Sequence, residues 1–253
     1  MKLSTHCNKK IITKCWVIFF WIMTWQVVHY IVGKDILVPS FYATMGKVFE
    51  LLGQANFYYD IGMTFYRVFM GVVISFVLGS LSALMAYFLP IIKELFTPFV
   101  TTLKSTPVMA VIILALLWFT KNNVPIFVCF LMCYPVVYTN ILKGLQEVNK
   151  DLLEMAYIFK VKQRYILKDL YLPQVRPYIE SALGMIIGLS WKVVIAAEVL
   201  AVPKYSMGYN LLSAKSYLET ETLFAWVVII VILSSLCEML VAKLIRRGGN
   251  KIW

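Results

Sequence analysis

The sequence predicts an all-α membrane protein with six transmembrane helices. The first observation is composition, because 61% of the 253 residues are hydrophobic, only 15% are charged and the mean hydropathy is +0.78, which exceeds what a soluble domain can bury. The second is a set of six apolar runs, each near the ~20 residues that a spanning helix needs. We expect one membrane domain over residues 1–253, with its core at 60–245. The runs cover residues 14–32, 64–89, 95–119, 124–142, 178–201 and 223–245.

The positions of the basic residues predict the orientation in the membrane. If the N-terminus is cytoplasmic, the alternating spans place the C-terminus and the polar segment 149–173 on the same side, with most of the 24 Lys and Arg residues. The opposite orientation would reverse this bias. Because the basic residues lie between apolar runs, the net charge of +11 indicates cytoplasmic loops and no nucleic-acid partner. We therefore expect a multi-pass protein of the cell membrane, embedded in lipid, with both termini cytoplasmic.

The first two runs have distinct features. The run at 14–32 follows several lysines, as in a secretory signal, but no small-residue cleavage site follows, so we expect a retained anchor. Apolar residues at helical spacing then predict a short amphipathic helix over 41–52, on the outer surface. In the second span, Gly71 and Gly79 are predicted to let a neighbouring helix approach closely.

The later runs carry further signals. Pro107 lies inside the third run and predicts a kinked helix there. Gly184 and Gly188 in the fifth run are spaced to form a close-packing face. Cys129 and Cys133 share a face of the fourth run, but neither His nor carboxylate accompanies them, so we expect no metal site.

The segment 149–173 is the longest charged stretch between apolar runs, and it predicts two short amphipathic helices. Asp151 is the predicted N-cap of the first, with Glu154 reaching back to the backbone of the cap. A second helix over 163–171 is predicted to stop at Pro173. The first helix either docks into a partner protein or rests on lipid headgroups. Its apolar stripe contains Leu152, Met155, Ala156 and Phe159.

Two lysines lie near the middle of predicted spans, where an ionisable residue costs ~2.5–3.5 kcal/mol on insertion scales. Lys104 precedes Pro107, and Lys192 follows Trp191. We predict that one or both lysines line the solute path and favour an anionic or carbonyl-rich solute. The alternatives are that Lys104 extends to the headgroups and that Lys192 pairs with a buried acceptor.

Two further charges lie at similar depth toward the outer side. Arg67 is near the start of the second span, and Glu198 is near the end of the fifth. We predict that they approach each other and help to latch an outer gate. The alternative is that each is hydrated separately at the interface.

The sequence lacks the common catalytic motifs. We find no phosphate-binding loop, no HExxH, no GxSxG and no cluster of Cys and His ligands, so we expect neither catalytic residues nor an enzyme. A self-contained secondary transporter of a small organic solute is the competing class. It would predict inverted repeats with paired broken helices, whereas the sequence contains one clear proline break and no evident repeat.

The charged segment resembles the "EAA" loop of ABC importer membrane subunits. Glu154 and Ala156 match that loop, and Leu172-Pro173 follow at the family's distance, although Lys160 stands where the family has glycine. Residues 103–110 with 117–119, and residues 190–200, resemble motifs of the nitrate/sulfonate/taurine-type permeases. The resemblance covers most of residues 60–245.

This resemblance implies a type I ABC importer permease fold with cytoplasmic coupling helices. It implies a homodimer, a cytoplasmic ABC ATPase that holds ATP and Mg, and an external substrate-binding protein, with no cofactor in this chain. The implied solute is a sulfonate-, taurine- or nitrate-like anion or a thiamine-precursor-like compound. Because lysine disfavours the positive φ of a glycine by ~1 kcal/mol, we expect a differently shaped turn at Lys160. The residues implied in ATPase coupling are Asp151, Glu154, Ala156, Phe159, Lys160, Leu172 and Pro173.

Overall fold

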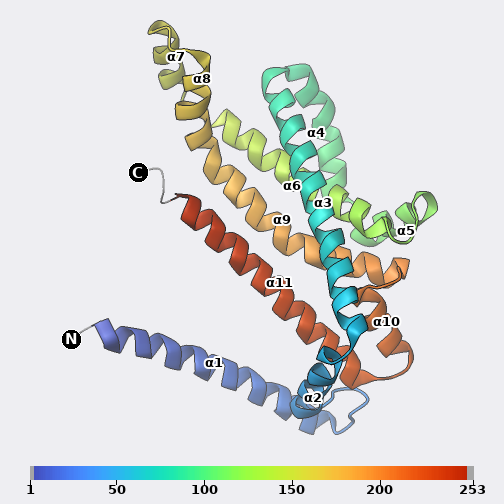
Figure 1. Ribbon diagram of the computed structural model, residues 1–253. Helices are drawn as coiled ribbons and strands as arrows, with labels where there is room; N and C mark the ends of the chain where they lie inside the picture. The colour runs from blue at the N-terminus through green and yellow to red at the C-terminus, as the bar shows by residue number, and fades with distance from the viewer. Residues whose placement is uncertain (1–2, 250–253) are drawn as a thin grey trace. The chain divides into compact units, whose positions relative to one another are not determined.

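The computed structural model describes residues 3–249, with side chains over 16–245. Within these residues all regular structure is helical (Figure 1). The predicted cytoplasmic placement of the chain ends falls on residues 1–2 and 250–253, which lie outside the described part. The helices are α1 (Leu3–Val32), α2 (Phe41–Leu52), α3 (Ala55–Phe88), α4 (Pro90–Ser105), α5 (Val108–Trp118), α6 (Val124–Gln146), α7 (Lys150–Ile158), α8 (Gln163–Tyr165), a π-helix η1 (Ile166–Tyr171), α9 (Leu172–Ala201), α10 (Met207–Ser216) and α11 (Thr220–Gly249).

The described helices include four that are long and apolar enough to cross a membrane, or five if α4 and α5 form one bent span. The first apolar run is present as the shorter stretch Trp16–Val32 of α1. The all-α membrane class is therefore confirmed, whereas the predicted count of six spanning helices is not. The clear spans are Ala55–Phe88, Val124–Gln146, Gln163–Ala201 and Thr220–Ile245.

The third predicted span is broken rather than kinked. Its two parts, α4 and α5, meet at a bend of 107°. Thr106 and Pro107 both have extended backbone at this break, with Pro107 at the N-cap of α5. Proline disfavours helical backbone at the residue before it, which here is Thr106. The expectation of one kinked helix over 95–119 was wrong, because the chain leaves the helix at the proline and begins a new one.

The chain divides into two compact units. The first combines the N-terminal part through Tyr58 with Asn210–Val231, and the second combines Tyr59–Tyr209 with the C-terminal part from Ile232. The expectation of a single membrane domain over residues 1–253 stays a prediction.

In the first unit, Trp25 of α1 holds the chain that leads into α2. Its indole Nε1 donates to the carbonyl of Pro39 at 3.0 Å, and its ring packs edge-on against Phe41 at 5.8 Å. Ser40 caps α2, because its Oγ accepts the backbone N–H of Ala43 at 3.1 Å. The helix predicted over 41–52 is therefore confirmed with those bounds.

In the second unit, α3 and α9 pack against α6. A Cβ at Gly71 of α3 would lie 2.6 Å from the Cys129 side chain of α6, and one at Gly79 would lie 2.9 Å from Val137. The predicted close approach at these two glycines is confirmed. α6 also meets α9, where the Cys133 thiol donates to the carbonyl of Ile186 at 3.8 Å.

Candidate functional site

The polar segment between α6 and α9 forms a protruding helical turn (Figure 1). Asn149 starts α7, because its side-chain Oδ1 accepts the backbone N–H of Asp151 at 2.8 Å and of Leu152 at 3.1 Å. The predicted N-cap at Asp151 was wrong by two residues. Asp151 instead lies in the first turn, where the positive end of the helix dipole stabilises its carboxylate.

The apolar face of α7 is open. None of the α7 residues is buried. Leu152 and Met155 are about half exposed, and Phe159 is 73% exposed. An exposed apolar face on a helix this short costs free energy unless something covers it. Ala156 lies on the same helix, half-buried, and Glu154 is exposed.

Lys160 ends α7 in a left-handed conformation, with φ of 51°. The backbone N–H of Val161 donates to the carbonyl of Ala156, and that of Lys160 donates to Tyr157, each at 3.0 Å. These two bonds make a Schellman motif, the helix ending usually built with glycine. The expectation of a differently shaped turn was therefore wrong: lysine adopts the conformation that glycine would supply.

Pro173 does not end the second helix. The chain from Gln163 to Ala201 continues as one helical path, with the π-helix η1 before the proline. The backbone N–H of Leu172 donates to the carbonyl of Leu167, five residues back. A wide turn shifts the hydrogen-bond register just before a residue that lacks an N–H. Leu172 and Pro173 thus join the loop directly to α9.

Arg67 of α3 and Glu198 of α9 form a buried ion pair. The guanidinium Nη1 donates to Glu198 Oε1 at 2.7 Å, and the two side chains are 1% and 0% exposed. Thr64 donates to the second carboxylate oxygen at 3.0 Å, and so does the backbone N–H of Gly208 at 3.1 Å. The carboxylate is therefore fully hydrogen-bonded, as a buried charge requires. The structure brings these two predicted residues together, while their role in a gate stays a prediction.

The same pair holds the chain segment between α9 and α10. Arg67 donates to the carbonyls of Lys204 at 3.2 Å and Tyr205 at 3.0 Å. A Cβ on Gly208 would overlap the Cβ of Glu198 and lie 2.8 Å from the backbone nitrogen of Val199. Sequence reasoning missed this segment, although the glycine ten residues after Glu198 was a signal of close approach.

Within residues 16–245, none of the predicted path residues bonds to Arg67 or Glu198. Lys104, in the last turn of α4, is exposed, as is Pro107 at the helix break. On α9, Trp191 is 2% exposed and its ring lies edge-on to Phe65 at 6.4 Å, whereas Lys192 is exposed. Neither lysine forms an ion pair with a residue in 16–245. The assignment of these residues to a solute path stays a prediction.

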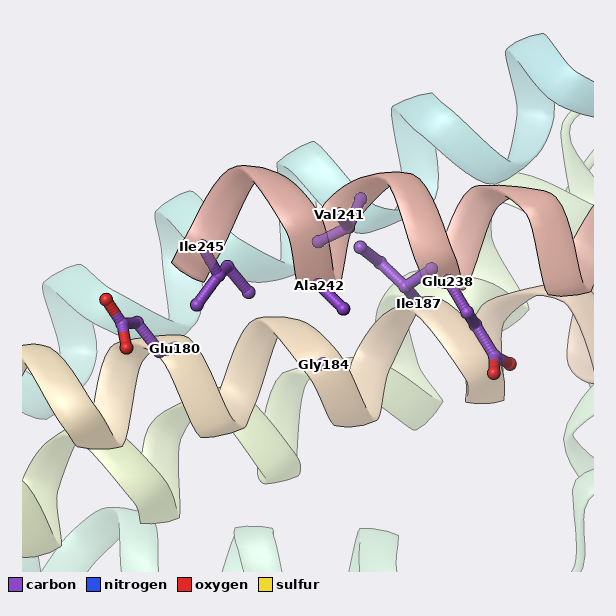
Figure 2. A pocket seen from close by; sticks show the side chains of 7 residues that line it. All are labelled: Glu180, Gly184, Ile187, Glu238, Val241, Ala242 and Ile245. Carbon is purple, nitrogen blue, oxygen red and sulfur yellow. The ribbon is translucent and has the colours of Figure 1, made fainter. Parts of the chain in front are cut away.

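A cleft of about 330 Å³ lies between α9 and the C-terminal part of α11, and Figure 2 shows the side chains that line it. Glu180 lies at one end and Glu238 at the other, with apolar side chains such as Ile187 between them. A Cβ on Gly188 would lie 2.7 Å from Glu238 Oε1, so this carboxylate reaches onto α9. At Gly184 a Cβ would meet nothing within 4 Å. The predicted close-packing role of Gly184 was therefore wrong.

Comparison with known proteins gives a family match over most of the chain. The family of binding-protein-dependent transport system inner membrane components matches residues 75–248. A Bacillus subtilis (strain 168) protein named as an aliphatic sulfonates transport permease, SsuC, is 24% identical over 89% of this chain and 82% of its own length. The taurine transport system permease protein TauC of Escherichia coli (strain K12) is 24% identical, over 62% of this chain and 58% of its own. The nitrate import permease protein NrtB of Leptolyngbya laminosa is 26% identical, over 66% and 58%.

The fold also has a match among solved structures. A chain of an amino acid ABC transporter superposes with a TM-score of 0.60 and 19% identity, covering 75% of this chain and 91% of the other. At this identity the match concerns the fold alone.

Proposed function

Because the chain belongs to the family of binding-protein-dependent transport system inner membrane components, we propose that it is the permease of an importer for a small anion. The chain is a transport subunit of the ABC importer class and not an enzyme. The names of three relatives, which refer to sulfonates, taurine and nitrate, support a sulfonate-, taurine- or nitrate-like anion as the solute. A thiamine-precursor-like compound is the second candidate from the sequence resemblance.

We propose that α7 docks into a separate cytoplasmic ABC ATPase, which holds ATP and Mg. The observation that carries this proposal is the exposed apolar face of a helix on a polar loop, directly continuous with the long helix α9. Burying Met155 and Phe159 in a groove of a partner would remove their apolar area from water. The helical path through Leu172 and Pro173 would then pass a movement of α7 to α9.

Further assignments follow from the family. We propose an external substrate-binding protein that delivers the solute, and a pair of these chains as the membrane unit, in the cell membrane with both termini cytoplasmic. Lys104 and Lys192 are the proposed cations of the solute path, beside Pro107 and Trp191. Arg67 and Glu198 are proposed to latch the outer gate. Their burial and full hydrogen bonding support a latch that holds α3 to α9.

The experiment that tests the docking proposal is Glu154→Lys. Glu154 is exposed on α7, so its replacement should leave membrane insertion and thermal stability unchanged. A reversed charge on the docking helix should abolish ATP-driven uptake. Asp169→Lys is the matched control, because Asp169 is an exposed acid of the same segment outside α7. Survival of ATP-driven uptake in Glu154→Lys would overturn the docking role of α7.

A further inference from the structure

A second cavity lies at the end of two spanning helices, beside the start of α7. Its volume is about 310 Å³. It is bordered by the last turn of α3, the first turn of α4, the end of α6 and the start of α7. The cavity lies entirely within the second compact unit.

The polar groups that line this cavity can bind an anion. Lys93 and Lys150 both line it, together with Tyr87 and Gln146, and no carboxylate is among its lining residues. Within residues 16–245, neither lysine forms an ion pair. Two cations and two neutral hydrogen-bonding groups therefore face one space that has no anion of its own.

The apolar surface beside the cavity indicates which kind of molecule carries the anionic group. Phe88 is 61% exposed, Leu89 is 52% exposed and Ile91 is 79% exposed, and these residues form the turn between α3 and α4 next to the cavity. Exposed apolar side chains at the end of a spanning helix face acyl chains. A cationic cavity that adjoins such a surface fits a ligand with an anionic head and an apolar tail.

We propose that this cavity binds the headgroup of an anionic phospholipid, with the phosphate held by Lys93 and Lys150. The tail lies along the exposed turn at Leu89. Because Lys150 is the first residue of α7, a bound headgroup joins the start of α7 to the start of α4. The lipid site is thus placed to set the position of the proposed docking helix, but lipid binding itself does not rest on the proposed transport function.

The test is lipid binding by the purified full chain in detergent. Phosphatidylglycerol, phosphatidylcholine with the same acyl chains, and inorganic phosphate are titrated separately while the thermal unfolding midpoint is followed. Binding to the folded state raises the midpoint. Wild-type protein should respond to phosphatidylglycerol and not to the other two. The double variant Lys93→Gln/Lys150→Gln should need about 25-fold more phosphatidylglycerol, since each interfacial lysine contributes about fivefold.

Lys143→Gln is the matched control. Lys143 is an exposed lysine in the last turn of α6, at the same end of the molecule but outside the cavity lining. This variant should respond like the wild type, and an unchanged midpoint without lipid shows that the double variant is folded. Three outcomes overturn the proposal: an unaltered response of the double variant, an equal response to phosphatidylcholine, or a full response to inorganic phosphate, which would indicate a soluble anion.

Discussion

The buried pair between Arg67 and Glu198 allows a quantitative prediction. Glu198→Gln removes the negative charge but keeps a side-chain oxygen that can still accept from Thr64 and Gly208. The guanidinium of Arg67 is then left buried without its counter-ion. Its remaining hydrogen bonds are to neutral groups, among them the carbonyls of Lys204 and Tyr205, and its Nε has no hydrogen-bond partner within the described residues.

The magnitude follows from burial. Removing one partner of a buried ion pair costs about 3–5 kcal/mol, because the remaining charge stays desolvated. The two side chains here are 1% and 0% exposed, so the full penalty applies. For a protein of this size the loss corresponds to a fall of roughly 6–20 °C in Tm. Arg67→Met should cost a similar amount, because it leaves the carboxylate uncompensated.

The assay is a double-mutant cycle, with the free energy of unfolding measured in detergent by denaturant titration. The double variant Arg67→Met/Glu198→Gln buries no unpaired charge, so it should be at least ~2 kcal/mol more stable than the sum of the single effects predicts. Single effects that add within ~0.5 kcal/mol would refute the reasoning. Such additivity would mean that the two charges do not interact in the folded protein.

Two further predictions concern backbone positions. Gly208→Ala should lower the free energy of unfolding by about 1–3 kcal/mol, because the added Cβ has no room beside Glu198 and Val199. Gly184→Ala places its Cβ in open space, so it should leave the free energy of unfolding unchanged in the same denaturant titration. Equal effects would contradict the close approach at Gly208. Asn149→Ala should loosen the start of α7 by ~1 kcal/mol, seen as faster amide hydrogen exchange at Asp151 and Leu152, whose N–H groups Asn149 accepts. Asp151→Ala should have the smaller effect, and the reverse order would restore Asp151 as the cap.

The four clear spans and the ion pair were predictable because they follow from the cost of polar groups in lipid. A run of apolar residues must span or be buried, and charges within spans tend to pair with one another, as Arg67 and Glu198 do. The glycines of α3 were also predictable, since their small size matters only where another helix comes close. In each of these cases a single physical requirement allows few alternative structures.

The remaining features depend on choices that are close in free energy. Asn149 and Asp151 are both good N-cap residues, and only the structure shows which one precedes the first turn. Lys160 pays a small conformational cost that the two Schellman hydrogen bonds offset. The π-helical turn before Pro173 and the 107° break at Pro107 are two different responses of a helix to proline.

Sequence reasoning also missed most of the segment that covers Glu198, apart from the signal at Gly208. Its contacts run from Arg67 to the backbone carbonyls of Lys204 and Tyr205, and backbone groups carry no residue-specific signal. The exposed face of α7, by contrast, could be recognised from the sequence. Its apolar residues were evident in the sequence, and the structure leaves them uncovered, so the proposed partner rests on what the chain itself does not bury.

The central claim is tested most directly by transport in vesicles built from purified components. The chain is reconstituted in liposomes alone, with its proposed ATPase, and with both the ATPase and the proposed external binding protein, and uptake of a labelled sulfonate, taurine or nitrate is measured with and without ATP. We predict uptake only when all three components and ATP are present. Uptake by the chain alone, driven by an ion gradient, would contradict the claim and indicate a self-contained secondary transporter.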